Sequence, residues 1–336
     1  MRWAVSFGEG NLALGLSRTA QRMAHAAGSR EPALWSLVGN TPLLPVEAPA
    51  ARPSGGALLL KAEWFNPGGS VKDRPAREIL RAGLAAGALP ERRLLDASSG
   101  NTAVAYAMLA AAGGIGVTVC VPANAARARR ALLRLYGAEV IETDQLEGSD
   151  GAIRRARELN AAAPQRYWYA DQYNNPANPR SHELTTGPEI WRATRGRLTH
   201  VVAGVGTSGT LIGTGRYLKA KRPGIRLVAV QPAGPLHGLE GLKHLATAIV
   251  PGIYDPALVD ETIYVTTEAA EARVRSLARE RGLFVGWSSG AALVAAADVL
   301  ARAAADRLGP PVVVVIAPDG GAACLSEERR LFGEEA

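Results

Sequence analysis

The sequence predicts an α/β protein of two domains, each built on an open, mostly parallel sheet flanked by helices. Three observations carry this prediction. The chain has 336 residues, which suits two domains. Short apolar runs rich in β-branched residues alternate along it with longer alanine-rich runs of helical spacing. Such alternation is typical of parallel strands covered by helices on both faces.

The predicted elements follow residues 1–35, which we interpret as an N-terminal extension containing a short amphipathic helix over 11–26. Strands are expected at 58–61, 93–97, 116–122, 139–143, 166–170, 198–203, 225–230, 282–285 and 311–317. The stretch N-N-P-A-N-P at 174–179 is typical of a loop and is a candidate crossing between domains.

The composition and charge of the chain exclude several classes of function. The net charge is +7, but the arginines at 268–281 are interspersed with acids, and no basic tail or nucleic-acid motif is present, so no nucleic acid is expected as a partner. No run is apolar and long enough to span a membrane, and no signal peptide is evident. The two cysteines are far apart and predict no metal site. A cytoplasmic location is therefore expected.

A glycine-rich loop, V-A-G-V-G-T-S-G-T at 202–210, lies between a predicted strand and a predicted helix. Glycines let the backbone approach a ligand, and the first amides of a helix have no internal partner, so the loop is suited to bind a phosphate. Gly204, Gly206 and Gly209 also match the dinucleotide pattern, which would indicate a nicotinamide dehydrogenase. The next strand ends at Gln231-Pro232 without the acid that holds a ribose, which favours a single phosphate. A turn that binds nothing is the remaining alternative.

Two further loops combine hydroxyl groups with a helix start. D-A-S-S-G-N-T-A at 96–103 could hold a carboxylate or a phosphate, or simply supply a serine or asparagine N-cap. V-G-W-S-S-G-A-A at 285–292 is explained by capping when it is considered alone.

Lys72, in W-F-N-P-G-G-S-V-K-D-R-P-A at 64–76, is one of five lysines against 33 arginines. A partly buried lysine near positive dipoles has a depressed pKa and can form a Schiff base with an aldehyde. Pyridoxal phosphate carries both an aldehyde and a phosphate, and so would use this lysine and the phosphate loop together. An exposed lysine paired with Asp73 or a helix acid is the alternative.

Eight motifs occur in the order typical of one family and cover about residues 36–330. Through them the chain resembles the β-family (fold type II) of pyridoxal-phosphate enzymes, in its cysteine synthase and cystathionine β-synthase branch. They are L-V-G-N-T-P-L-L (37–44), N-P-G-G-S-V-K-D-R (66–74), S-S-G-N-T-A (98–103), D-Q-Y-N-N-P-A-N-P (171–179), T-T-G-P-E-I-W (185–191), G-V-G-T-S-G-T (204–210), G-W-S-S-G-A-A (286–292) and A-P-D-G-G (317–321). The resemblance implies a large cofactor-binding domain of residues 36–74 and 180–336, and a smaller mobile domain of residues 75–179.

The resemblance also implies roles for individual residues. Lys72 would hold the cofactor as a Schiff base and then act as base on the substrate. The rest of the cofactor would contact Asn101 at its ring hydroxyl, Ser288 at its pyridine nitrogen, and Gly206, Thr207, Ser208, Gly209 and Thr210 at its phosphate. The substrate carboxylate would contact Ser98, Ser99, Thr102 and Gln172.

The implied reaction is β-replacement, in which an O-activated L-serine (O-acetyl or O-phospho) loses its activating group and the resulting aminoacrylate takes up a sulfur nucleophile to give L-cysteine. A homodimer is the implied assembly. Cystathionine β-synthase-like or serine dehydratase activity is an alternative, and so is a family member that binds a ligand or partner without turnover.

Four features depart from the usual family pattern: Ser208, Ala103, Gln231, and the tail A-P-D-G-G-A-A-C-L-S, which lacks the E-R-Y usual in cysteine synthases. The segment P-L-H-G-L-E-G-L-K-H at 235–244 lies where some relatives bind the leaving group. Lys243 is a candidate for that contact, and a lysine facing solvent is the alternative.

Overall fold

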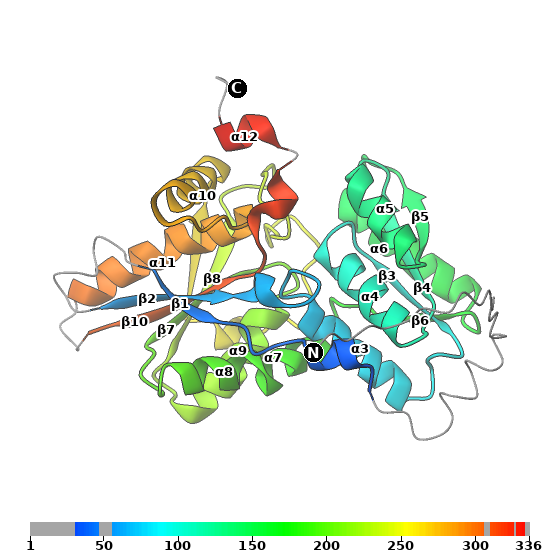
Figure 1. The fold of residues 1–336 in the computed structure, drawn as a ribbon, viewed down its shortest axis with the longest axis horizontal. Coiled ribbons are helices and arrows are strands. Elements are labelled where there is room, and N and C mark those ends of the chain that lie inside the picture. Colours follow the sequence, from blue (N-terminus) through cyan, green and yellow to red (C-terminus); the bar gives the residue numbers. More distant parts are fainter. Residues whose placement is uncertain (1–30, 47–55, 306–309, 326, 333–336) are drawn as a thin grey trace, which may run out of the picture.

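The structure is a computed structural model that describes residues 31–46, 56–305, 310–325 and 327–332. Two separate sheets form its framework (Figure 1). The six-stranded sheet has the order β1 (Leu43–Val46), β2 (Ala57–Ala62), β10 (Val312–Ala317), β7 (His200–Gly204), β8 (Arg226–Pro232), β9 (Glu261–Val265). The four-stranded sheet has the order β5 (Glu139–Thr143), β4 (Val117–Pro122), β3 (Arg93–Ala97), β6 (Tyr167–Tyr169). All neighbours are parallel except β1 and β2, which are antiparallel.

Helices cover both faces of the six-stranded sheet (Figure 1). One face packs on α10 (Thr267–Arg281) and α11 (Trp287–Ala305), whose apolar side chains join β2, β8 and β10 in one core cluster. The other face packs on α8 (Thr186–Ala193) and α9 (Gly209–Lys221), and α7 (Ala177–Leu184) lies against α9. Because both faces are buried, the central strands are apolar runs rather than alternating patterns.

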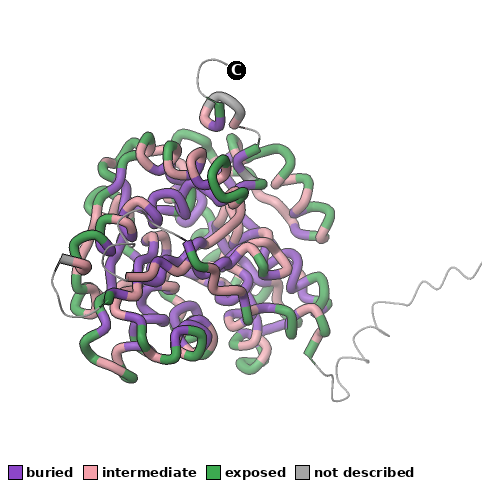
Figure 2. The backbone as a smooth tube through the Cα atoms, turned by 60° about the vertical axis from the view of Figure 1, so that its left-hand side comes forward, coloured by how far each residue is buried: buried purple, intermediate pink, exposed green. Residues whose placement is uncertain are grey.

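The four-stranded sheet is covered in the same way. The helices α3 (Asp73–Ala85), α4 (Asn101–Ala112) and α5 (Arg127–Leu135) share a core with one face, and α6 (Gly148–Ala162) packs on the other. Every residue of β4, V-T-V-C-V-P, is buried. Figure 2 shows the buried segments concentrated in the interior of the molecule and the exposed ones on its outer turns. Short elements complete the described chain: α2 (Ala33–Ser36), α12 (Glu328–Phe332), and the 3-10 turns η2 (Glu63–Phe65), η3 (Pro256–Leu258) and η4 (Gly321–Cys324).

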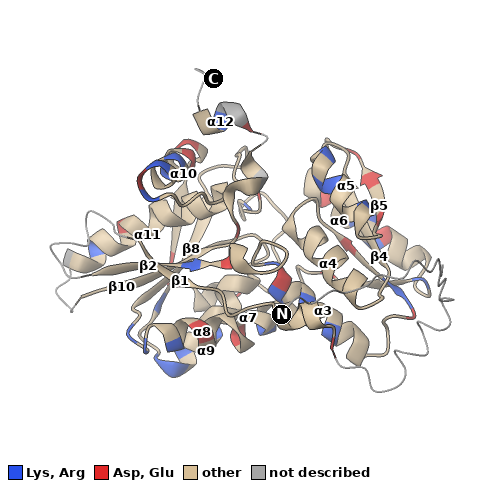
Figure 3. Cartoon of the chain, in the orientation of Figure 1, with Lys and Arg blue, Asp and Glu red and all other residues tan. Residues whose placement is uncertain are grey.

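Charged residues of both signs share the outer helices (Figure 3). On α11, for example, Arg302 pairs with Asp298 at 3.0 Å and with Glu261 at 2.7 Å. Among the described residues, no helix combines the length and apolarity needed to cross a membrane. Cys120 and Cys324 are both buried and free.

The α/β class with two parallel-sheet units is confirmed, and one predicted strand is wrong. Residues 282–285 join α10 to α11: Gly282 ends α10 with φ 66°, and only Val285 pairs, in an isolated bridge with Gly320. Two edge strands of the six-stranded sheet, β1 and β9, were not predicted: both are short and partly exposed, and Pro45 interrupts the apolar run of β1. The helix expected at 11–26 lies outside the described residues. The strands of the small sheet all fall between residues 93 and 169, while the domain bounds remain a prediction.

Candidate active site

One cavity of about 200 Å³ lies between the two sheets, where their parallel strands end. Its wall is made by the loops after β3, β7 and β10, by the loop before α3, and by the start of α11. Eleven of the thirteen predicted site residues line it: Lys72, Ser98, Ser99, Asn101, Thr102, Gln172, Gly206, Thr207, Thr210, Lys243 and Ser288. The structure therefore brings together residues that are up to 216 positions apart in the sequence, between Lys72 and Ser288.

Ser208 and Gly209 are not on the cavity wall, although they belong to the predicted phosphate loop. Ser208 is buried at the start of α9 in a left-handed conformation with φ 70°, and its hydroxyl has no hydrogen-bond partner among the described residues. A side chain at Gly209 would overlap Asn178, since an added Cβ would lie 2.0 Å from its Oδ1. These two residues shape the turn rather than facing the cavity with their side chains.

The two threonines of the phosphate loop are held by buried partners from α7. Thr207 Oγ1 accepts a hydrogen bond from Asn178 Nδ2 at 3.1 Å, and its own proton stays available for the cavity. Thr210 Oγ1 lies 3.3 Å from His182 Nε2, and His182 Nδ1 lies 2.9 Å from Thr186 Oγ1. Burial lowers the pKa of His182 well below its ordinary value, so the ring is neutral. Thr207 and Thr210 thus face the cavity at the N-terminus of α9, where helix amides favour an anion.

The carboxylate loop also has internal support. Thr102 Oγ1 donates to Gln172 Oε1 at 2.9 Å, and Gln172 Nε2 donates to the carbonyl of Ala97 at 3.0 Å. The N-cap of α4 is Gly100, without a side-chain cap, so simple serine capping does not explain the hydroxyls here. Ser98 Oγ instead accepts from the Gly100 amide at 3.2 Å.

Lys72 lies at the start of α3 with its side chain on the cavity wall. Burial lowers the pKa of its amine, and the negative charge of Asp319 opposes that shift. The alternative of an exposed lysine paired with Asp73 or a helix acid is wrong, because Lys72 is partly buried on the cavity wall and forms no such ion pair among the described residues. A lowered lysine pKa in a cavity is what nucleophilic amine chemistry requires.

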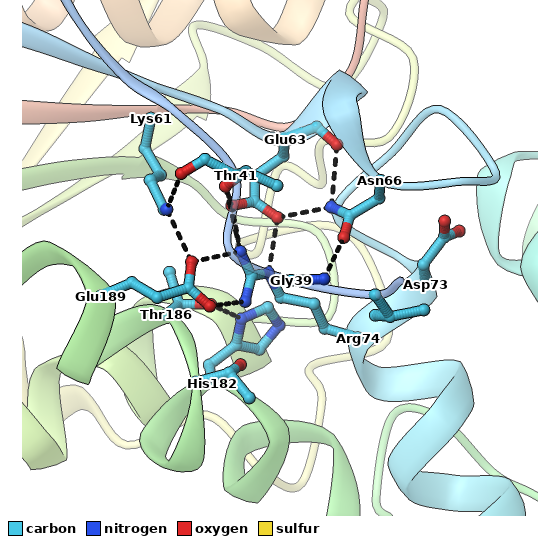
Figure 4. Close-up of polar contacts among 12 residues, drawn as sticks. Gly39, Thr41, Lys61, Glu63, Asn66, Asp73, Arg74, His182, Thr186 and Glu189 are labelled. Atoms are coloured by element: carbon cyan, nitrogen blue, oxygen red, sulfur yellow. Dashed lines mark hydrogen bonds and ion pairs between the residues drawn. The ribbon is translucent and has the colours of Figure 1, made fainter. Parts of the chain in front are cut away.

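A buried ion cluster anchors the segment that follows Lys72 (Figure 4). Arg74, fully buried, binds Glu63 through Nε at 2.6 Å and Glu189 through Nη1 at 2.8 Å. Lys61 binds Glu189 at 2.7 Å and the Thr41 carbonyl at 2.6 Å. The cluster joins β2, the start of α3 and α8, and so fixes the lysine-bearing turn to the large sheet.

Two ion pairs cross the mouth of the cavity from the segment between β8 and η3. Glu240 binds Arg129 of α5 at 2.5 Å, and Arg129 also donates to the carbonyl of Ser99 at 3.2 Å. Lys243 binds Asp150 of α6 at 3.3 Å and lies over the ring of Tyr173 at 5.1 Å. Lys243 is only 9% exposed, so a lysine facing solvent is wrong for this position.

Sequence reasoning missed several residues of the site. Asp319, Arg129, Glu240 and Tyr173 line the cavity, and His182 supports it from behind. A signal existed for Asp319, which follows a buried strand at the edge where ligands bind. No local signal exists for Arg129 and Glu240, because the role of each is visible only through its ion-pair partner, which lies on a distant segment of the chain.

The residues fit pyridoxal phosphate. An amine with a lowered pKa, two threonine hydroxyls at a helix N-terminus, the Asn101 amide and the Ser288 hydroxyl all line one cavity. The amine can react with the aldehyde of the cofactor, and the threonine hydroxyls can bind its phosphate. The Asn101 amide can bind the ring hydroxyl, and the Ser288 hydroxyl can bind the ring nitrogen.

Comparisons with known proteins agree with this site. Residues 34–319 match the family model described as pyridoxal-phosphate dependent enzyme. A cysteine synthase of Aquifex aeolicus (strain VF5) is 50% identical over 263 residues, 77% of this chain and 80% of the relative. Cysteine synthase B of Escherichia coli (strain K12) is 39% identical over 264 residues, 78% of this chain and 86% of the relative.

Comparison with solved structures finds similar enzymes. O-acetyl serine sulfhydrylase isoform 3 from Entamoeba histolytica aligns with a TM-score of 0.81 at 32% identity, covering 89% of this chain and 91% of the other. An O-acetylserine dependent cystathionine beta-synthase from Helicobacter pylori aligns with a TM-score of 0.79 at 32% identity, covering 87% of this chain and 96% of the other. The chain belongs to the family of pyridoxal-phosphate-dependent enzymes.

Proposed function

We propose that the protein is a cysteine synthase, which replaces the activating group of an O-activated L-serine with sulfur from a sulfide donor to give L-cysteine. The observation that carries the proposal is the meeting of Lys72 with the phosphate loop and the carboxylate loop in one cavity. The cysteine synthases among its relatives support the choice of reaction.

Each group in the cavity has a proposed task. Lys72 holds the cofactor and then moves the substrate's α-proton. Gly206, Thr207, Ser208, Gly209 and Thr210 bind the cofactor phosphate, with Ser208 and Gly209 contributing through the backbone of the turn. The hydroxyls of Thr207 and Thr210 are oriented by Asn178 and His182. Asn101 contacts the ring hydroxyl and Ser288 the ring nitrogen. Ser98, Ser99, Thr102 and Gln172 bind the substrate carboxylate.

When bound, pyridoxal phosphate withdraws electrons from the substrate's α-carbon and makes its proton removable. Ser288 is neutral, so it supports a positive ring nitrogen less well than a carboxylate would. β-Elimination tolerates this weaker electron withdrawal, because the activating group departs as the proton is lost. Transamination, which needs a longer-lived carbanion, is disfavoured by the same serine.

Closure of the smaller domain, proposed to span residues 75–179, would exclude water from the reacting atoms. The two ion pairs across the mouth support this proposal. Arg129 touches both the carboxylate loop and Glu240, so a bound carboxylate and closure are coupled through one side chain. We further propose a homodimer located in the cytoplasm, which sedimentation of the purified protein and cell fractionation would check.

The experiment that tests the proposal is an assay of the purified protein with pyridoxal phosphate. O-acetyl- and O-phospho-L-serine are each supplied with sulfide, thiosulfate or homocysteine, and the products are separated. L-cysteine from sulfide supports the proposal. Cystathionine from homocysteine alone would favour the cystathionine β-synthase alternative, and the Helicobacter pylori neighbour gives that outcome a concrete precedent. Pyruvate from L-serine would indicate a dehydratase, and a protein that binds without turnover would contradict catalysis.

Lys243 is proposed to recognise the activating group of the substrate. We expect Lys243→Ala to lower kcat/KM for O-phospho-L-serine by roughly ten-fold or more, because a charge-assisted contact to a phosphate is lost, and to affect O-acetyl-L-serine less. Asp150→Asn is the matched control, since it frees the Lys243 amine from its ion pair without removing it. Equal loss on both substrates, or no loss, would contradict a role in recognising the activating group.

A further inference from the structure

Asp319 lies just after β10, an interior strand of the six-stranded sheet, and lines the same cavity as Lys72. Among the described residues, two acidic side chains line this cavity, Asp319 and Glu240. Glu240 is already paired with Arg129 at the mouth. Asp319 has no ion pair of that kind, which leaves its charge available to the interior of the cavity.

The backbone around Asp319 is tied to the turn that carries Lys72. The amide of Val71 donates to the carbonyl of Pro318 at 2.7 Å, and Ser70 forms a bridge with Asp319. Ser289 Oγ donates to the carbonyl of Asp319 at 3.2 Å. Two segments far apart in the sequence therefore form one unit, and the carboxylate has a fixed position relative to the lysine.

Only one of the two carboxylate oxygens of Asp319 has a hydrogen-bond partner among the described residues. Asp319 Oδ2 accepts a hydrogen bond from Asn101 Nδ2 at 2.7 Å, while Oδ1 is buried without a partner in the described part of the chain. Gly286 makes room for Oδ1, since an added Cβ there would lie 2.1 Å from it. A buried oxygen without a partner costs free energy, and such a cost at a reaction centre points to a functional role.

The electrostatics agree with the geometry. Burial raises the pKa of Asp319 to about 6, so the group is mostly ionised at neutral pH. Its negative charge opposes the lowering of the Lys72 pKa that burial causes. Asp319 and Lys72 therefore stabilise each other's charged forms inside the cavity.

We propose that Asp319 is a positioning residue for proton transfer by Lys72, whose ammonium form it stabilises when the lysine takes the substrate's α-proton. The inference rests on the proposed function and deepens it. In this step the Cα–H bond breaks and the proton passes to the Lys72 nitrogen. The electron pair of that bond forms the second bond between Cα and Cβ, and the activating group leaves with the pair of the Cβ–O bond.

The first test needs no turnover. In cofactor-free protein, Lys72 is labelled with acetic anhydride across a range of pH, and the labelled residue is identified by mass spectrometry. We expect Asp319→Asn to shift the labelling midpoint to lower pH and to raise labelling severalfold at a fixed pH below the wild-type midpoint, because the ammonium loses its counter-charge. Asparagine keeps an acceptor for Asn101. Glu240→Gln, which removes the other cavity carboxylate, should leave the midpoint unchanged.

The second test uses the active holoenzyme with α-deuterated O-acetyl-L-serine. We expect Asp319→Asn to lower kcat by roughly ten-fold, part of the 10² to 10⁴ that general acid–base catalysis contributes, and to enlarge the deuterium isotope effect. An unchanged labelling midpoint would overturn the proposal, and so would a shifted midpoint with an unchanged isotope effect. Should Asp319→Asn fail to fold, Asp319→Ser carries the same tests. If the wild-type protein makes no cysteine, the proposed function fails while the labelling result still stands.

Discussion

Lys72→Ala is expected to abolish turnover, with kcat/KM falling by roughly 10³-fold or more, because one side chain supplies both the covalent attachment and the proton transfer. Arginine could not replace it, since a guanidinium keeps its proton and forms no Schiff base. The burial that lowers the pKa of Lys72 is the physical basis of both tasks. The checks are steady-state kinetics and the visible spectrum of the purified protein.

Borohydride reduction distinguishes attachment from mere binding. Wild-type protein should keep the reduced cofactor on a peptide containing Lys72, and Lys72→Ala should keep none. Lys219→Ala is the matched control: it removes a lysine of α9 that pairs with Asp260 at 2.8 Å, away from the cavity, and should retain activity. Residual activity within ten-fold of wild type in Lys72→Ala would contradict the assigned role.

Much of the framework could be predicted from the sequence, because buried parallel strands carry a strong local signal. The runs 93–97 and 116–122 contain strands β3 and β4 as expected, and nearly every residue of both strands is buried because both faces of their sheet are covered. Edge strands were predicted less consistently, since β5 was expected although it is partly exposed, while β1 and β9 were not expected. β1 and β9 are partly exposed, and their residues are compatible with a loop.

The loops that line the cavity could be predicted from the sequence, but the ion pairs between distant segments around it could not. Glycine and hydroxyl residues at strand ends indicated where anions could bind, and Thr207 and Thr210 do line the cavity. Ser208 shows the limit of a motif, because it is buried away from the cavity while its neighbour Thr207 lines it. The partners Arg129 and Glu240 lie 111 positions apart, and only the packing of the two sheets reveals their contact.

The buried ion cluster illustrates a second limit, since composition does not say which charges are buried. Arg74 has no exposed surface and binds Glu63 and Glu189 at once (Figure 4). Arg74 lowers the pKa of Glu189, which is about 2 despite the opposing effect of burial. Such clusters are strongly destabilised when one partner is removed, because the other charges stay buried without compensation.

Arg74→Met is therefore expected to lower the free energy of unfolding by about 3–5 kcal/mol at pH 7. The measurement is urea denaturation of the cofactor-free protein, so that ligand binding adds nothing to the comparison. Arg302→Ala is the matched control: it breaks surface ion pairs with Asp298 and Glu261 and should cost less than about 1 kcal/mol.

The pH dependence of that loss tests its cause. In the wild type, the lowered pKa of Glu189 contributes stability that is present above its unfolded value of roughly 4.3 and is lost as the pH falls toward 2. In Arg74→Met, Glu189 is buried beside fewer positive charges, so its protonation stabilises the variant relative to its state at pH 7. The difference in unfolding free energy should consequently shrink between pH 7 and pH 4. A difference that stays constant over this range would assign the loss to packing of the arginine side chain rather than to its charge.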